Sequence, residues 1–154
     1  PGMRARAIDG ALGKLKTNAD CAGIYNINGK GLGPVDLLQK LAAGDTEYGV
    51  IRYGYIENPK VSATTTRLIV EPESSIESGA LIILNDDLDS NWFRGDEQDR
   101  VLTILHELGH AFDIIYGRGS SALPANEIEE GISRPEQTRR SMQNSAFVRE
   151  KCFR

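Results

Sequence analysis

Histidine, cysteine and tryptophan are scarce in this sequence of 154 residues, which contains two, two and one of them. With two histidines, a metal site built from three imidazoles is excluded. The two cysteines lie near opposite ends of the chain, at Cys21 and Cys152, and this spacing matches neither a zinc ribbon nor a CxxC redox pair. Any metal centre in this chain must therefore include a ligand that is not histidine.

Long apolar runs and blocks of like charge are also missing. No run approaches the roughly 20 residues that span a bilayer, and residues 1–6 lack the apolar segment of a signal peptide. The net charge is −4, so a nucleic acid or an anionic membrane is not an expected partner. We expect residues 1–154 to form one monomeric domain, either complete or excised from a longer protein.

The hydrophobic pattern predicts an α+β fold with a small mixed sheet packed on a long helix. Apolar residues at helical spacing indicate helices over residues 3–17, from Pro34 onwards, and from Asp96 and Glu97 to about Tyr116, ending at Gly117. A last helix is predicted to open at Ser133, its N-cap, and to reach towards Cys152. Residues rich in β-branched and aromatic side chains predict strands within 48–56, 61–70 and 80–84.

The nonapeptide LHELGHAFD, residues 105–113, contains both histidines of the chain. In a helix, His106 and His110 are one turn apart on one face, so both imidazoles can bind one metal ion. Glu107 points to the flank, where it can reach a metal-bound water as a general base. The other face is an apolar stripe of Val101, Ile104, Leu105, Leu108, Phe112 and Ile115. The alternative interpretation is an amphipathic helix that carries two histidines by chance.

A zinc site of this kind needs a third protein ligand, and a carboxylate is the best candidate. The segment NEIEEG, residues 126–131, offers Glu127, which we favour, and then Glu130. Asp113 is an alternative ligand, although its position also suits an acceptor for an imidazole N–H. The glutamates of NEIEEG could instead belong to a solvated loop. Cys21 and Cys152 are weaker candidates as ligands, and they are either two unrelated thiols or a disulfide between the two ends of the chain.

The motif HELGHAFD, followed by an acidic residue, resembles the zincin superfamily of zinc metallopeptidases. From residue 105 onwards, HELGHAFDIIYGRGSS and NSAFVREKCF are similar to C-terminal domains of bacterial RHS/YD-repeat proteins, many of which are secreted polymorphic toxins. The resemblance implies a zincin-like fold, bound zinc (Zn²⁺), a peptide or protein substrate, and delivery as part of a larger secreted bacterial protein. The chain lacks HExxHxxGxxH and NExxSD, so the resemblance does not identify the third ligand.

Zincins bind an extended peptide along the edge strand of their sheet, above the helix that carries the active site. The resemblance therefore implies a substrate-binding edge formed by Ala80, Leu81, Ile82, Ile83 and Leu84. A buried central strand is the alternative for this segment. Tyr116, Arg118 and Arg134 are candidates for stabilising an oxyanion.

These features predict a zinc-dependent endopeptidase in which His106, His110 and Glu127 bind the metal and Glu107 is the general base. One alternative is a zincin-fold interaction domain without catalytic activity. Another is a different metal-dependent amidase, which would use a cysteine ligand.

Overall fold

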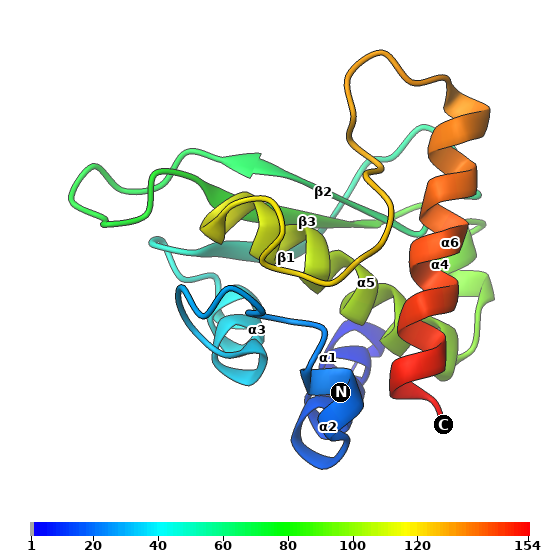
Figure 1. Cartoon of the computed structure of the whole chain (residues 1–154). Coiled ribbons are helices and arrows are strands. Elements are labelled where there is room, and N and C mark those ends of the chain that lie inside the picture. The colour runs from blue at the N-terminus through cyan, green and yellow to red at the C-terminus, as the bar shows by residue number, and fades with distance from the viewer. Residues whose placement is uncertain (1) are drawn as a thin grey trace.

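Residues 2–154 are described by the computed structural model, and in this range the chain forms six helices and three strands (Figure 1). In chain order the elements are α1 (Met3–Thr17), α2 (Ala19–Ala22), α3 (Pro34–Ala43), β1 (Gly49–Gly54), β2 (Ala63–Leu68), β3 (Gly79–Asn85), α4 (Asn91–Arg94), α5 (Glu97–Tyr116) and α6 (Arg134–Cys152). The predicted α+β class is confirmed: a three-stranded mixed sheet packs on the long helix α5, with helices at both ends of the chain.

The strand order of the sheet is β1-β3-β2, so β3 is the central strand. It pairs in parallel with β1 and antiparallel with β2. The prediction that Ala80, Leu81, Ile82, Ile83 and Leu84 form an edge was therefore wrong. Backbone groups on both sides of β3 are already bonded to neighbouring strands, which leaves none for an added peptide. A continuous apolar run is typical of a strand buried in the middle of a sheet.

The outer edge of the sheet nearest α5 is β2. Asn85 N–H donates to the Ser62 carbonyl at 2.9 Å, which makes these two residues a hydrogen-bonded antiparallel pair. Pairing alternates along such a ladder, so Thr64 and Thr66 also bond to β3. The N–H and C=O groups of Ala63, Thr65 and Arg67 consequently point away from the sheet.

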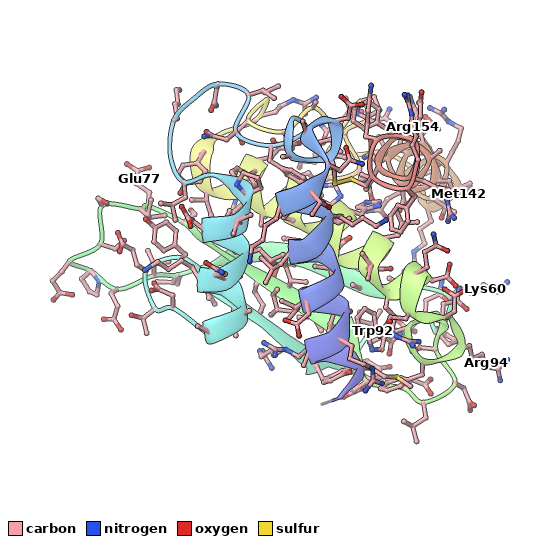
Figure 2. All side chains as sticks on the ribbon, turned by 90° about the horizontal axis from the view of Figure 1, so that it is seen from below. Lys60, Glu77, Trp92, Arg94, Met142 and Arg154 are labelled. Carbon is pink, nitrogen blue, oxygen red and sulfur yellow. A yellow bond between two sulfur atoms is a disulfide. The ribbon has the colours of Figure 1, made fainter. Side chains whose placement is uncertain are left out.

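One face of the sheet packs on the helical layer. Ala80, Ile82 and Leu84 of β3 are fully buried, and α5 contacts both β2 and β3 on that face. Helices α1 and α3 run side by side (Figures 1 and 2). Helix α1 packs against α5, and α3 packs against β1. Helix α5 begins at a capping box in which the side chains of Asp96 and Asp99 each accept from the other's backbone N–H.

Helix α6 stands at one end of the sheet (Figure 1) and is polar along most of its length. Three of its residues are buried, Asn144, Val148 and Cys152, at a spacing of four that places them on one side of the helix. Cys152 forms a disulfide with Cys21, which joins the two ends of the chain across 131 residues. Such a bond is consistent with an extracytoplasmic protein. Within residues 2–154, no helix has the length and apolarity needed to cross a bilayer.

Removing the disulfide should destabilise the fold strongly, because it closes a loop of 131 residues and anchors a helix with little apolar contact. We expect reduction to lower the free energy of unfolding by about 2–5 kcal/mol. Urea unfolding with and without dithiothreitol measures this difference. The Cys21→Ser/Cys152→Ser double variant should match the reduced protein and should not respond to dithiothreitol. Equal stability of oxidised and reduced protein would contradict the prediction.

Candidate metal centre

Two imidazoles and a carboxylate lie together on the buried face of α5. His106 and His110 are one helical turn apart, and their Nε2 atoms are separated by 3.1 Å. His106 is 4% exposed and the adjacent Glu107 is 7% exposed. The opposite side of the helix packs Leu105 and Leu108 into the core, which fixes the rotation of α5 and thereby the direction of both imidazoles. The structure thus contains a buried His-Glu-x-x-His group of the kind that can hold a metal ion.

Glu127 reaches this group from the segment between α5 and α6. Its Oε2 atom lies 2.7 Å from Nε2 of His106 and 2.7 Å from Nε2 of His110. Ligands at zinc-bond length in a tetrahedron are separated by about 3.3 Å, so a small outward shift of the three atoms would accommodate the ion. The chemistry of the donor set, two imidazole nitrogens and one carboxylate oxygen, also suits Zn²⁺.

Glu107 and Glu127 both approach the imidazoles, but their positions differ. The ligand atoms of His106, Glu107 and His110 all lie within 4.8 Å of one another. However, Glu107 Oε2 is 3.8 Å from His106 Nε2, whereas Glu127 is in direct contact with both rings. Oε1 of Glu107 also accepts a hydrogen bond from the Thr65 hydroxyl of β2 at 2.9 Å. Glu127 therefore has the better geometry for a ligand. Glu107 lies beside the triangle of candidate ligand atoms formed by Nε2 of His106, Nε2 of His110 and Oε2 of Glu127, called the ligand triangle below.

The charges of this cluster depend strongly on one another. Burial alone would raise the pKa of Glu127, but its hydrogen bonds with the two imidazoles outweigh burial and hold the pKa well below its usual range. Burial would lower the pKa of His110, yet the hydrogen bond with Glu127 and the nearby carboxylates raise it to about 9. Burial raises the pKa of the Glu107 carboxyl. These shifts favour a protonated His110 imidazole beside an ionised Glu127 carboxylate.

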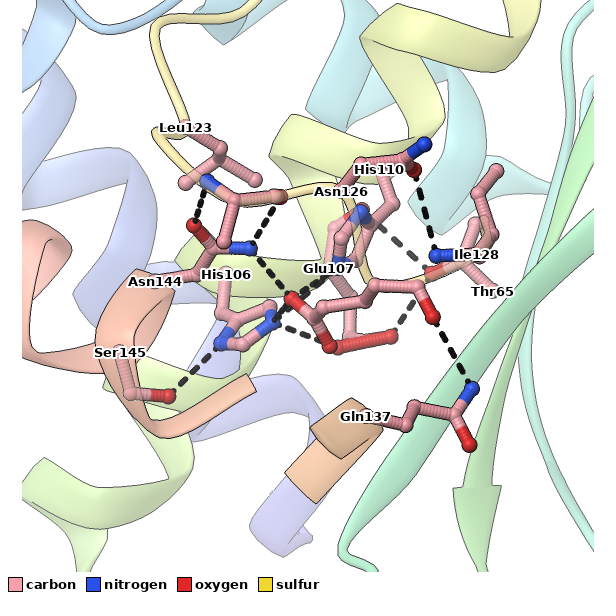
Figure 3. A network of polar contacts seen from close by, with 12 residues as sticks. Thr65, His106, Glu107, His110, Leu123, Asn126, Ile128, Gln137, Asn144 and Ser145 are labelled. Carbon is pink, nitrogen blue, oxygen red and sulfur yellow. Dashed lines mark hydrogen bonds and ion pairs between the residues drawn. The ribbon is translucent and has the colours of Figure 1, made fainter. Parts of the chain in front are cut away.

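Side chains from α6 and β2 surround this cluster on opposite sides (Figure 3). Ser145 Oγ lies 2.7 Å from Nδ1 of His106, and Asn144 Nδ2 donates to Glu127 Oε2 at 2.6 Å. With Nδ1 donating to the serine, Nε2 of His106 presents its lone pair to the ligand triangle. Sequence reasoning missed Thr65, Asn144 and Ser145. Asn144 is the first residue of NSAFVREKCF, but nothing in that pattern indicates a contact with Glu127.

Several other predicted residues lie elsewhere. The carboxylate of Asp113 accepts from Ser121 N–H, Ser121 Oγ and Ser120 Oγ, at 2.8, 2.9 and 3.3 Å, so it holds the segment that follows α5. Among residues 2–154, no hydrogen bond joins Asp113 to an imidazole; its carboxylate is bonded to the two serines instead. Glu130 is exposed, and the backbone N–H of Leu32 donates to the Tyr116 hydroxyl.

Both cysteine sulfurs belong to the disulfide, so neither can be the thiolate ligand that the amidase alternative required. This leaves the carboxylates as the source of a third ligand.

A cleft of about 590 Å³ opens beside the cluster, a volume in the range of small-molecule and peptide sites. His110 and Glu127 line it from the helix and the loop, and Arg67 of β2 lines it from the sheet. Arg118 also lines the cleft, whereas Arg134 does not. Leu123 also lines the cleft and packs closely on α5: a Cβ atom on Gly109 would lie 2.5 Å from a methyl group of Leu123, so glycine lets the loop approach the helix.

Comparison with known proteins identifies no relative of this chain: no family model, curated protein or solved structure matches it.

Proposed function

We propose that this protein is a zinc-dependent endopeptidase whose metal ligands are His106, His110 and Glu127. One observation carries the proposal: a single carboxylate oxygen lies 2.7 Å from Nε2 of both histidines, in a buried cluster that opens on a cleft. Three protein ligands leave the fourth position of a tetrahedral ion for water or substrate, as in catalytic zinc sites. When bound, the zinc ion would acidify a water molecule and polarise the scissile carbonyl group.

Glu107 is the general base of the proposed reaction. It lies next to the ligand triangle without being part of it, and burial raises the pKa of its carboxyl, which makes the carboxylate a stronger proton acceptor. The Thr65 hydroxyl holds Oε1, so Oε2 is the oxygen turned towards the imidazoles. Glu107 would take the proton of the attacking water and pass it to the leaving amine. Arg118 is the candidate for stabilising the oxyanion, because it lines the same cleft.

The proposed substrate is an extended peptide bound along β2. The outward backbone groups of Ala63, Thr65 and Arg67 can pair with a peptide by strand addition. Thr65 is bonded to Glu107, so a peptide paired there passes beside the general base. Arg67 extends the same strand along the cleft.

The proposed setting is an effector or toxin domain carried by a larger secreted bacterial protein. The disulfide is consistent with an oxidising compartment, and the toxin class is inferred only from the likeness of residues 105–153 to domains of RHS/YD-repeat proteins.

Metal content tests the ligand set directly. The purified protein should bind one equivalent of zinc, and Glu127→Ala should lose most of it, because two imidazoles alone bind zinc weakly. Glu130→Ala is the matched control, since Glu130 lies in the same segment and is exposed. Mass spectrometry of the metals in dialysed protein gives the ratio. A Glu127→Ala variant that retains one equivalent of zinc would refute this ligand set.

Catalysis is separated from metal binding by Glu107→Gln. This change keeps the shape of the side chain and removes the base, so the variant should retain its zinc while turnover falls at least about 100-fold. Cleavage is followed by mass spectrometry on a peptide library from a digested proteome. If the wild type binds zinc but cleaves nothing in the library, and Glu107→Gln behaves identically, the interaction-domain alternative is favoured.

Strand addition at β2 is tested by Arg67→Pro against Arg67→Ala. Proline removes an N–H that points away from the sheet, so the fold should tolerate it, while one hydrogen bond to the peptide is lost. We expect kcat/KM to fall by about 3- to 10-fold more for Arg67→Pro than for Arg67→Ala. Thr66→Pro removes an N–H bonded to β3 and should instead lower the melting temperature. Equal kcat/KM values for the two Arg67 variants would argue against strand addition.

A further inference from the structure

Glu127 lies in an irregular segment, the connection between α5 and α6 that spans residues 117–133. A glutamate in such a segment has a flexible side chain and no regular backbone structure to orient it. Its carboxylate nevertheless meets both imidazoles. Some other part of the molecule must therefore hold this segment in place.

Helix α6 holds the backbone around Glu127 through three of its polar side chains. Gln137 Nε2 donates to the Glu127 carbonyl at 3.1 Å, and Arg140 Nη1 donates to the Asn126 carbonyl at 2.9 Å. Asn144 bonds to both backbone groups of Ala125, accepting from its N–H and donating to its carbonyl, each at 2.9 Å. Residues 137, 140 and 144 follow one another at helical spacing, so one face of α6 carries all these contacts.

Asn144 differs from the other two side chains because it also contacts the ligand carboxylate. The second N–H of its amide donates to Glu127 Oε2 at 2.6 Å, and this is the oxygen that faces both imidazoles. Asn144 has no exposed surface. Its three hydrogen bonds use both amide hydrogens and the amide oxygen, so the side chain has a fixed orientation and transmits it to Glu127.

The next residue of α6, Ser145, acts in the same way on the first histidine. Its Oγ lies 2.7 Å from Nδ1 of His106, while Nε2 of the ring faces Glu127. Partners at the far nitrogen of a ligating histidine fix its orientation and tautomer. Two consecutive residues of α6 are thus bonded to two of the three proposed ligands.

We propose that Asn144 is a positioning residue for the metal centre, which sets the place of Glu127 without touching the ion, and that Ser145 does the same for His106. The inference rests on the proposed ligand set. Asn144 restricts Glu127 to one orientation before the metal binds, so the affinity for zinc and the coordination geometry both depend on a residue outside the ligand set. In this proposal the C-terminal helix α6 belongs to the metal site, because it orients two of the three ligands.

The test compares Asn144→Leu, Ser145→Ala and Gln143→Ala. Leucine keeps most of the buried volume and removes the three hydrogen bonds, whereas Gln143 is an exposed neighbour on the same helix and is the control. Zinc affinity is measured by competition with a chelator, and the visible absorption of the Co²⁺-substituted protein reports the coordination geometry. We expect the zinc Kd to rise about 10- to 100-fold for Asn144→Leu, with a changed Co²⁺ spectrum. A smaller rise is expected for Ser145→Ala and less than twofold for Gln143→Ala.

The outcomes separate this inference from the proposed function. A wild type that does not bind zinc refutes the proposed function and this inference with it. A wild type that binds zinc, with Asn144→Leu showing the same Kd and Co²⁺ spectrum, refutes the inference alone, even if the metal-free variant is less stable. If Asn144→Leu does not fold, Asn144→Ser and Ser145→Ala decide: wild-type affinity and spectrum in both refute the positioning role.

Discussion

The fold and the site both depend on the requirement that α5 be buried on two sides at once. Its apolar stripe packs under the sheet, as in any amphipathic core helix. Its histidine face is buried as well, beneath the segment that carries Glu127 and beside α6. Polar groups in that position must satisfy one another. The direct contacts of His106 and His110 with Glu127 meet this requirement, and the elements packed around them are those that supply the remaining partners.

The features predictable from the sequence were those that local spacing encodes. The HExxH pair, the Ser133 cap and the end of α5 at Gly117 each depend on residues within one or two helical turns. Strand order depends instead on residues far apart in the sequence. The apolar segment 80–84 suits a central strand as well as an edge strand until its partners are known. The burial of Asn144 was equally impossible to predict from the sequence. On a helix as polar as α6, a buried asparagine looks like any surface residue, and only the disulfide at Cys152 and the contact at Val148 show which side faces inward.

Two kinds of contact hold α6 in place beside the metal centre although the helix has little apolar surface. Helix α6 is anchored at its C-terminal end by the Cys21–Cys152 disulfide and by Asn18, whose side chain donates to the Lys151 carbonyl at 3.0 Å. Two turns before Cys152, Asn144 bonds to Ala125 and Glu127. A covalent anchor at one end and a hydrogen-bonded network in the middle replace the hydrophobic packing that such a helix cannot provide. The disulfide therefore anchors the same helix whose Asn144 is bonded to Glu127.

Charge balance gives a reason for a divalent ion, beyond the distances. Glu107 and Glu127 bring two carboxylates into a buried cluster, together with imidazoles that are neutral when they act as ligands. Two buried negative charges without compensation are costly: burial raises the pKa of Glu107, whereas the imidazoles compensate Glu127 and lower its pKa, and Glu127 in turn raises the pKa of His110. A divalent ion at the ligand triangle would balance both carboxylates. It would also leave Glu107 ionised and free to accept a proton, which is the state that a general base requires.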